Sequence, residues 1–127
     1  MEDNRAAPNL IGATTITGKT SGTSLTTTSA TSVLSNAASS GKCLKVNTLN
    51  VSNTTGTAAT VTVSYYNAAA IGGTGFAIVG TMSVAANSTI NVIDKSSQYY
   101  LEENSSLGAT AGTANALVVT VSYEDIS

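Results

Sequence analysis

Apolar and polar residues alternate along the last two-thirds of the chain, and this alternation limits the possible folds more than any other feature of the sequence. The first clear example contains two alternating pairs with a shift of one residue between them, Leu44 with Val46 and Leu49 with Val51. Because successive side chains of a strand point to opposite faces of a sheet, the pattern predicts a strand that bulges or bends near Asn47.

More segments of this kind follow along the chain. Residues 59–65 alternate without a break and the turn residues 53–57 precede them, so we predict a hairpin between this strand and the one before it. The Gly-containing stretches 71–75 and 102–115 predict loops. Other apolar runs predict strands at 76–79 and 82–84, which are separated at Gly80, and at 89–93, 98–101 and 116–123. The last run is the most apolar and should lie centrally in a sheet.

The N-terminal third has a different composition. It is dominated by Thr, Ser, Ala and Gly, and it has too few apolar residues to order itself alone. We predict an extended arm over residues 1–36, contributing one or two edge strands and partly ordered by assembly, followed by a β-sandwich domain over 37–127. We expect the assembly contacts to involve the apolar residues of the arm: Leu10, Ile11, Ile16, Leu25, Val33 and Leu34.

Helix is weakly supported throughout. The best candidate, 29–38, is rich in Ser and Thr, which compete with a helix for backbone hydrogen bonds. Six to eight short strands joined by turns, in a chain of 127 residues, are typical of one domain. We therefore predict an all-β fold, a single antiparallel β-sandwich that is either a jelly roll or Ig-like, with an extended N-terminal arm.

The surface predicted from the composition carries little charge. Charged residues make up 9% of the chain, whereas ordinary soluble domains have about a quarter. Charge keeps neighbouring molecules apart, so we expect a protein that is sticky or already assembled. The net charge of −2 leaves no basic patch for phosphates, so we expect no nucleic-acid partner.

The chain also lacks the apolar segments that would direct it to a membrane. No stretch approaches the roughly 18 continuous apolar residues of a membrane helix. Residues 1–8 have neither the basic nor the apolar region of a secretory signal. We therefore expect no membrane partner and synthesis in a cytoplasm.

Histidine, the side chain most used for acid–base and metal chemistry near neutral pH, does not occur in the sequence. Its absence excludes Ser-His-Asp and Cys-His catalytic arrangements. The single cysteine, Cys43, lies in a predicted strand beside Lys42 with no base to activate it, and we expect it to be a small residue of the core. We therefore predict that the protein is not an enzyme and carries no cofactor.

Two other patterns admit a ligand but have simpler explanations. Asp94, Glu102 and Glu103 could offer oxygen atoms to Ca²⁺, yet no EF-hand or repeat pattern supports such a site, and solvated loops explain these residues. Residues 13–20 match a degenerate phosphate-binding loop, but no buried strand precedes them and no helix follows. We predict neither a metal site nor a nucleotide site.

The aromatic residues include two doublets, Tyr65–Tyr66 and Tyr99–Tyr100. On a strand, each doublet places one ring inward and one outward, and an outward ring could stack on a sugar or on a partner protein. Without Trp and with few polar neighbours, packing in the core and at interfaces is the preferred explanation. Exposed aromatic side chains clustered around a concave site would favour the glycan-binding alternative.

Several segments carry a resemblance to a known family: KCLKVNTLNVSN (42–53), ATVTV (59–63), MSVAANST (82–89), DK and YLEE (94–95 and 100–103), and VSYEDIS (121–127). Residues 30–127 resemble small virion structural proteins of tailed bacteriophages, notably those of cyanobacteria, in which a short β-domain follows a Thr/Ser-rich N-terminal segment. Related sequences usually have Pro before the first clear strand and before Ala86, and Gly after Glu103. This chain has Ala, Ser or Asn at these positions, which affects the expected loops more than the expected fold.

The resemblance implies a place in the virion, after synthesis in the host cytoplasm, and no catalytic residues. We expect a non-enzymatic structural subunit, first of all a capsid decoration or cement protein that binds the shell through its β-domain and its N-terminal arm. The alternatives are a neck, tail or fibre component, and a glycan- or receptor-binding module. The expected partners are other virion proteins, either the major capsid protein or neck and tail proteins, and further copies of the chain in a homo-oligomer, for which a trimer is one option.

Overall fold

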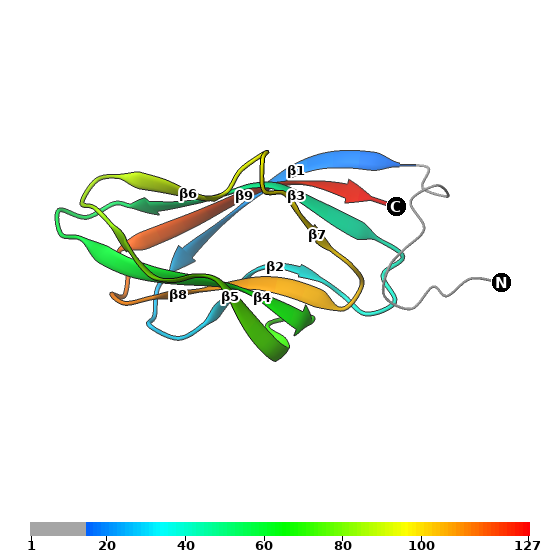
Figure 1. The fold of residues 1–127 in the computed structure, drawn as a ribbon, viewed down its shortest axis with the longest axis horizontal. Coiled ribbons are helices and arrows are strands. Elements are labelled where there is room, and N and C mark those ends of the chain that lie inside the picture. Colours follow the sequence, from blue (N-terminus) through cyan, green and yellow to red (C-terminus); the bar gives the residue numbers. More distant parts are fainter. Residues whose placement is uncertain (1–14) are drawn as a thin grey trace.

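The computed structural model describes residues 15–127, and within this range the chain forms nine strands and no helix. Figure 1 shows them as two layers. The strands are β1 (Ile16–Leu25), β2 (Thr31–Asn36), β3 (Cys43–Asn53), β4 (Ala59–Ala68), β5 (Gly72–Val84), β6 (Thr89–Ile93), β7 (Tyr99–Leu101), β8 (Ser105–Ala111) and β9 (Leu117–Ile126).

The strands form two antiparallel sheets packed face to face as a sandwich. One sheet has the order β1-β9-β3-β6, with the short β7 also paired with β3, and the other has the order β2-β8-β4-β5. All pairings within both sheets are antiparallel. The predicted all-β fold, a single antiparallel β-sandwich, is confirmed.

The strands pair as they would in one long hairpin that is folded over to form the two sheets. Partner residues lie nearly equally far before and after Ile71: β1 pairs with β9, β2 with β8, β3 with β6 and β7, and β4 with β5. Because successive strands from β1 to β4 alternate between the two sheets, the fold is a jelly roll rather than an Ig-like sandwich.

The turn at the centre of this hairpin is fixed by side chains from other strands. Ala70 and Ile71 have φ values of 55° and 52°, the left-handed pair of a type I′ turn, which non-Gly residues adopt at a cost. Three successive backbone N–H groups donate to side-chain oxygens at 2.8–3.0 Å, Ala69 to Asn104, Ala70 to Ser35 and Ile71 to Ser106. Ser106 also donates to the Ala68 carbonyl, so these hydrogen bonds offset the backbone strain.

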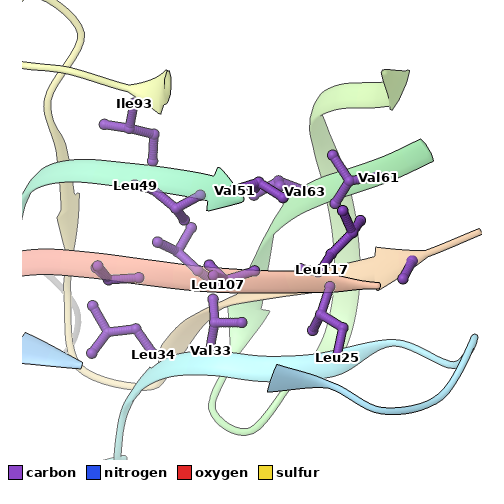
Figure 2. Close-up of a cluster of buried hydrophobic side chains, with 14 of the residues drawn as sticks. Leu25, Val33, Leu34, Leu49, Val51, Val61, Val63, Ile93, Leu107 and Leu117 are labelled. Carbon is purple, nitrogen blue, oxygen red and sulfur yellow. The ribbon is translucent and has the colours of Figure 1, made fainter. Parts of the chain in front are cut away.

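Leu, Val, Ile and Ala side chains fill the space between the two sheets. Figure 2 shows part of this core, in which side chains from both sheets and from the N-terminal strands meet. Burial of each large aliphatic side chain contributes roughly 1.5–3 kcal/mol. The largest fully buried residues are Leu25, Val46, Leu49, Val51, Val61, Val63, Val84, Ile93, Leu101, Leu107, Leu117 and Val119.

Two buried asparagines stabilise the connections by which the chain passes from one sheet to the other. The Asn53 amide donates to the carbonyls of Thr57 and Val84, and its Oδ1 accepts hydrogen bonds from Thr55. The Asn36 amide in the same way donates to the carbonyls of Lys42 and Leu101. Both asparagines are about 2% exposed, and these hydrogen bonds satisfy their buried amide groups.

Several local predictions are confirmed. The register between β3 and β9 shifts between Val46 and Thr48, which places a bulge at Asn47 as the slipped alternation predicted. The most apolar strand, β9, lies between β1 and β3 in the interior of its sheet. Cys43 is buried in β3.

The predicted hairpin and the two predicted loops are wrong. β3 and β4 belong to different sheets, because each buries its apolar side chains against the other across the core. The expected loop at 71–75 is instead the start of β5, in which Gly75 leaves room for a ring: a Cβ there would lie 2.7 Å from Tyr66 Cε2.

The expected loop at 102–115 contains β8, a nearly completely buried strand made of small residues. Glycine is needed at its centre, since a Cβ on Gly108 would lie 2.8 Å from Tyr66 Cε1 and 2.7 Å from Ile71 Cγ2. Ser, Ala and Gly predict a loop from sequence, but here they allow the sheet to pack closely against larger neighbours.

The predicted division at residue 36 needs correction. β1 and β2 are edge strands of the two sheets, as the arm was expected to supply, but they are integral to the sandwich. Leu25, Val33 and Leu34 are at most 8% exposed because pairing with β9 and β8 points them into the core. The β-sandwich therefore includes residues 16–36, which the prediction had assigned to the arm.

Candidate functional site: an aromatic groove

A groove of about 360 Å³ opens at the side of the sandwich where β5 faces β7. It brings Tyr65 and Phe76 together with Tyr99 and Tyr100, which follow Phe76 by more than twenty residues in the sequence. Its lining comprises Tyr65, Phe76, Ala77, Ile78, Tyr99 and Tyr100. Phe76 is 53% exposed and Tyr100 is 49% exposed. The groove is therefore an aromatic surface that reaches solvent.

The groove lies between a long strand of one sheet and a short strand of the other. β5 has 13 residues, whereas β7, which pairs with β3, has only three. Tyr65 pairs with Phe76 across β4 and β5, and their rings stack at a centroid distance of 6.3 Å and an interplanar angle of 28°. Such a pair contributes about 0.5–1.5 kcal/mol beyond its buried area and holds a flat platform in place.

The chemistry available in the groove is contact and stacking. Its six lining residues offer aliphatic surface, aromatic faces and phenol groups. The tyrosine hydroxyls can donate and accept hydrogen bonds, while the rings can stack on an apolar side chain or on the apolar face of a sugar. The arrangement suits binding of a partner.

A second, smaller cavity of about 240 Å³ lies on the other side of the sandwich and is polar. Asp125 in β9 is held between two lysines, with its Oδ2 3.1 Å from Lys19 Nζ and 3.2 Å from Lys42 Nζ. The carboxylate side chain is 8% exposed, and the two lysine side chains are 44% and 45% exposed. The ion pairs thus tie β1 and the start of β3 to the strand between them.

The pKa of Asp125 reflects two opposing effects. Burial by itself would raise the pKa, but the hydrogen bonds and charges of Lys19 and Lys42 outweigh it and hold the pKa of Asp125 below its ordinary value. The carboxylate is therefore ionised at neutral pH, and the cluster acts as an ionic clamp within the fold.

The residues considered for chemistry from the sequence are spread over the molecule. Burial, and then the nearby charge of Glu102, raises the pKa of the Cys43 thiol, which disfavours the reactive thiolate. Hydrogen bonds from Ser96 and Ser97 lower the pKa of Asp94 within its own turn. Glu103 accepts a hydrogen bond from the Gly41 N–H. In residues 15–127, no three acidic, cysteine or histidine residues cluster to hold a metal ion.

The phosphate-loop-like segment continues into β1, an antiparallel edge strand, from Ile16 onward. A phosphate-binding loop needs a helix after it, and here a strand follows.

Among the described residues, no helix is long and apolar enough to cross a membrane.

The predicted assembly residues fall into three groups. Leu10 and Ile11 lie outside the described residues. Ile16, at the start of β1, is 66% exposed and available for contact, whereas Leu25, Val33 and Leu34 belong to the core. The sequence did not single out Phe76, the most exposed aromatic residue, because only the pairing of β4 with β5 brings it next to Tyr65.

Comparison with known proteins identifies no relatives: no family model matches the chain, and no curated protein or solved structure matches it significantly.

Proposed function

We propose that the chain is a non-enzymatic structural subunit of a tailed-phage particle, acting as a capsid decoration or cement protein. The aromatic groove carries the proposal, because it offers an exposed apolar contact surface at one side of a weakly charged sandwich. A partner that covers Phe76 and Tyr100 removes this surface from water. The groove therefore suits permanent packing against another protein.

Two further observations support the proposal. Jelly rolls are common in virus capsid proteins, although this is an analogy between folds and many other proteins share the architecture. The resemblance of residues 30–127 to phage virion proteins points in the same direction. Ile16, together with Leu10 and Ile11 before it, supplies apolar side chains for an N-terminal contact with the shell.

The test is to measure copies per particle and to restore binding. Phage particles made without this chain are incubated with purified protein, and the bound copies are counted by quantitative mass spectrometry. Decoration predicts hundreds of copies spread over the head. A dozen copies or fewer at one vertex would support a neck or tail position instead, and the absence of binding would contradict the proposal.

The contribution of the N-terminal segment is measured with a chain that lacks residues 1–14. The cut spares β1 and the hydrogen bonds between Thr15 and Ser127, so the unfolding midpoint should stay unchanged. We expect particle affinity to fall at least tenfold, which corresponds to about 1.4 kcal/mol. Equal affinity of the truncated and full-length chains would show that the arm does not contribute.

Glycan or receptor binding is the second candidate, and the same groove favours it, because aromatic side chains cluster around a concave site. Titration with oligosaccharides, followed by NMR shifts of the groove residues, tests this candidate. Tyr100→Ala should abolish such binding, and Tyr66→Phe, on the other face of β4, is the matched control. If no oligosaccharide shifts the groove resonances at millimolar concentration, this candidate is rejected.

A further inference from the structure

β1 presents an unusually regular sheet edge. It lies at the end of its sheet, and its ten residues pair one by one with β9, from Ile16 opposite Ile126 to Leu25 opposite Leu117, without a register shift. No strand of the described chain pairs with its other side. The backbone N–H and C=O groups on that side therefore form a straight row that another strand can bind.

The devices that usually protect an edge strand are weak in β1. The strand contains no proline and only one charged residue, Lys19. That charge already has a partner in Asp125 at 3.1 Å, so covering the edge would not leave an unpaired ammonium group. The other edges are protected: β5 carries three register shifts, β2 carries one, and β6 has only five residues.

The side chains of β1 leave its backbone accessible. Gly18 and Gly22 lie on the face opposite the core, and a Cβ added at either position would meet nothing within 4 Å. The packing of this chain therefore does not require glycine at these positions. Glycine weakens an isolated strand, so a bare backbone on an edge strand is consistent with a neighbouring strand that supplies the missing contacts.

We propose that β1 is an assembly edge on which β1 of a second copy of this chain adds in antiparallel orientation about a two-fold axis. The two five-stranded sheets then join into one continuous sheet. Thr and Ser side chains of the two strands lie opposite one another and can hydrogen-bond in cross-strand pairs. The only charge on each strand is turned toward its own Asp125, so no repulsion between like charges opposes the pairing.

The size of the edge sets the strength of the association. A ten-residue edge is about 34 Å long, and with a depth of about 10 Å it covers on the order of 350 Å² on each copy. Stable complexes bury about 800 Å² on each partner. The dimer is therefore weak in solution, with a dissociation constant in the micromolar range, and it forms fully where copies are concentrated. Two-fold pairing also implies a dimer as the basic unit, not the trimer considered from the sequence.

Analytical ultracentrifugation of the full chain tests this proposal independently of any phage particle. The wild type should approach twice the monomer mass as its concentration rises to about 500 μM. Thr20→Lys places a charge at the middle of the exposed face of β1 and should weaken dimerisation at least tenfold. Thr74→Lys makes the same change at an exposed position of β5 and should leave dimerisation unchanged.

Each result decides for or against the β1 dimer. A wild type that stays monomeric at every concentration overturns the proposal, and so does a Thr20→Lys variant that dimerises as the wild type does. If Thr74→Lys abolishes association instead, the contact belongs to β5. Thermal unfolding checks that both variants fold, and Ser24→Lys, another exposed position on β1, replaces Thr20→Lys if that variant does not.

Discussion

β1 and β5 are both long edge strands, yet they keep their register very differently. β1 pairs with β9 over ten residues in one unbroken register, whereas the pairing of β5 with β4 shifts three times along 13 residues. A positive φ of 49° at Thr81 adds a further bend to β5. The comparison teaches that this fold closes one edge to backbone pairing and leaves the other open.

The two strands also differ in what holds them to the sandwich. The ion pair between Lys19 and Asp125 anchors β1 from within, while side-chain oxygens around the turn at Ala69–Ile71 anchor the start of β5. The exposed apolar side chains differ as well: β5 contributes Phe76 to the groove, whereas β1 has Ile16 at its first residue. We therefore expect side chains to mediate contacts at β5 and the backbone to mediate contacts at β1.

The largest expected effect follows from releasing the start of β5. Ser106→Ala removes one hydroxyl that donates to the Ala68 carbonyl and accepts from the Ile71 N–H, leaving both groups without this partner in a site where Ser106 is fully buried. We expect the free energy of unfolding to fall by about 2–3 kcal/mol in urea titrations. Ser83→Ala, at an exposed position of β5, should change the free energy of unfolding by less than about 0.5 kcal/mol. Equal effects of the two variants would show that the turn does not anchor β5.

An intermediate effect is expected from loosening β1. Asp125→Asn removes the charge that both lysines bind, and we expect a loss of about 1–2 kcal/mol at pH 7. Because the folded-state pKa of Asp125 lies below its unfolded value, the ionised carboxylate stabilises the fold above about pH 4, and this contribution disappears as the pH falls through the folded-state pKa.

The stability difference between wild type and Asp125→Asn should therefore shrink toward zero below about pH 4. Urea titrations of both proteins between pH 7 and pH 2.5 measure this difference directly, and effects of the other carboxylates cancel between them. A difference that stays constant over this range would contradict the ionic clamp.

The smallest effects are expected from replacing one glycine in each of the edge strands β5 and β1. Gly75→Ala in β5 brings a Cβ within 2.7 Å of Tyr66 Cε2, so the ring must shift, and we expect a loss of about 1 kcal/mol. Gly22→Ala in β1 meets nothing within 4 Å and should gain up to about 0.5 kcal/mol by restricting the unfolded chain. Thermal unfolding of the two variants should thus shift in opposite directions. A shift in the same direction would mean that the two edges do not differ in packing.

The sequence was informative wherever a strand buries one face and exposes the other. The slipped alternation around Asn47 predicted both the strand and its bulge, and the apolar run from Leu117 predicted a central strand. Such patterns are readable because burial on one face of a strand selects every second residue. Where residues are small and both faces are covered, as in β8, the alternation disappears and the strand was missed.

The candidate site was less predictable than the fold. The sequence identified the tyrosine doublets and their potential for stacking, but Phe76 joined them only through the register of β4 and β5, and Tyr99 and Tyr100 only through the opposite sheet. The same limitation explains why Leu25, Val33 and Leu34 were predicted to make assembly contacts. They lie in a segment with few apolar residues, and nothing in that segment indicated that pairing with β9 and β8 would place them in the core.

By itself the sequence determined the class of the protein: an antiparallel β-sandwich with an aliphatic core, a buried cysteine and a weakly charged surface. Those properties depend on which side chains are buried away from water, and the alternation of apolar and polar residues within each strand indicates which side chains these are. The tertiary structure alone decided the jelly-roll nesting about Ile71, the aromatic groove and the contrast between β1 and β5. These depend on which strands pair across long stretches of chain, and alternation indicates that a strand has a buried face without naming its partner.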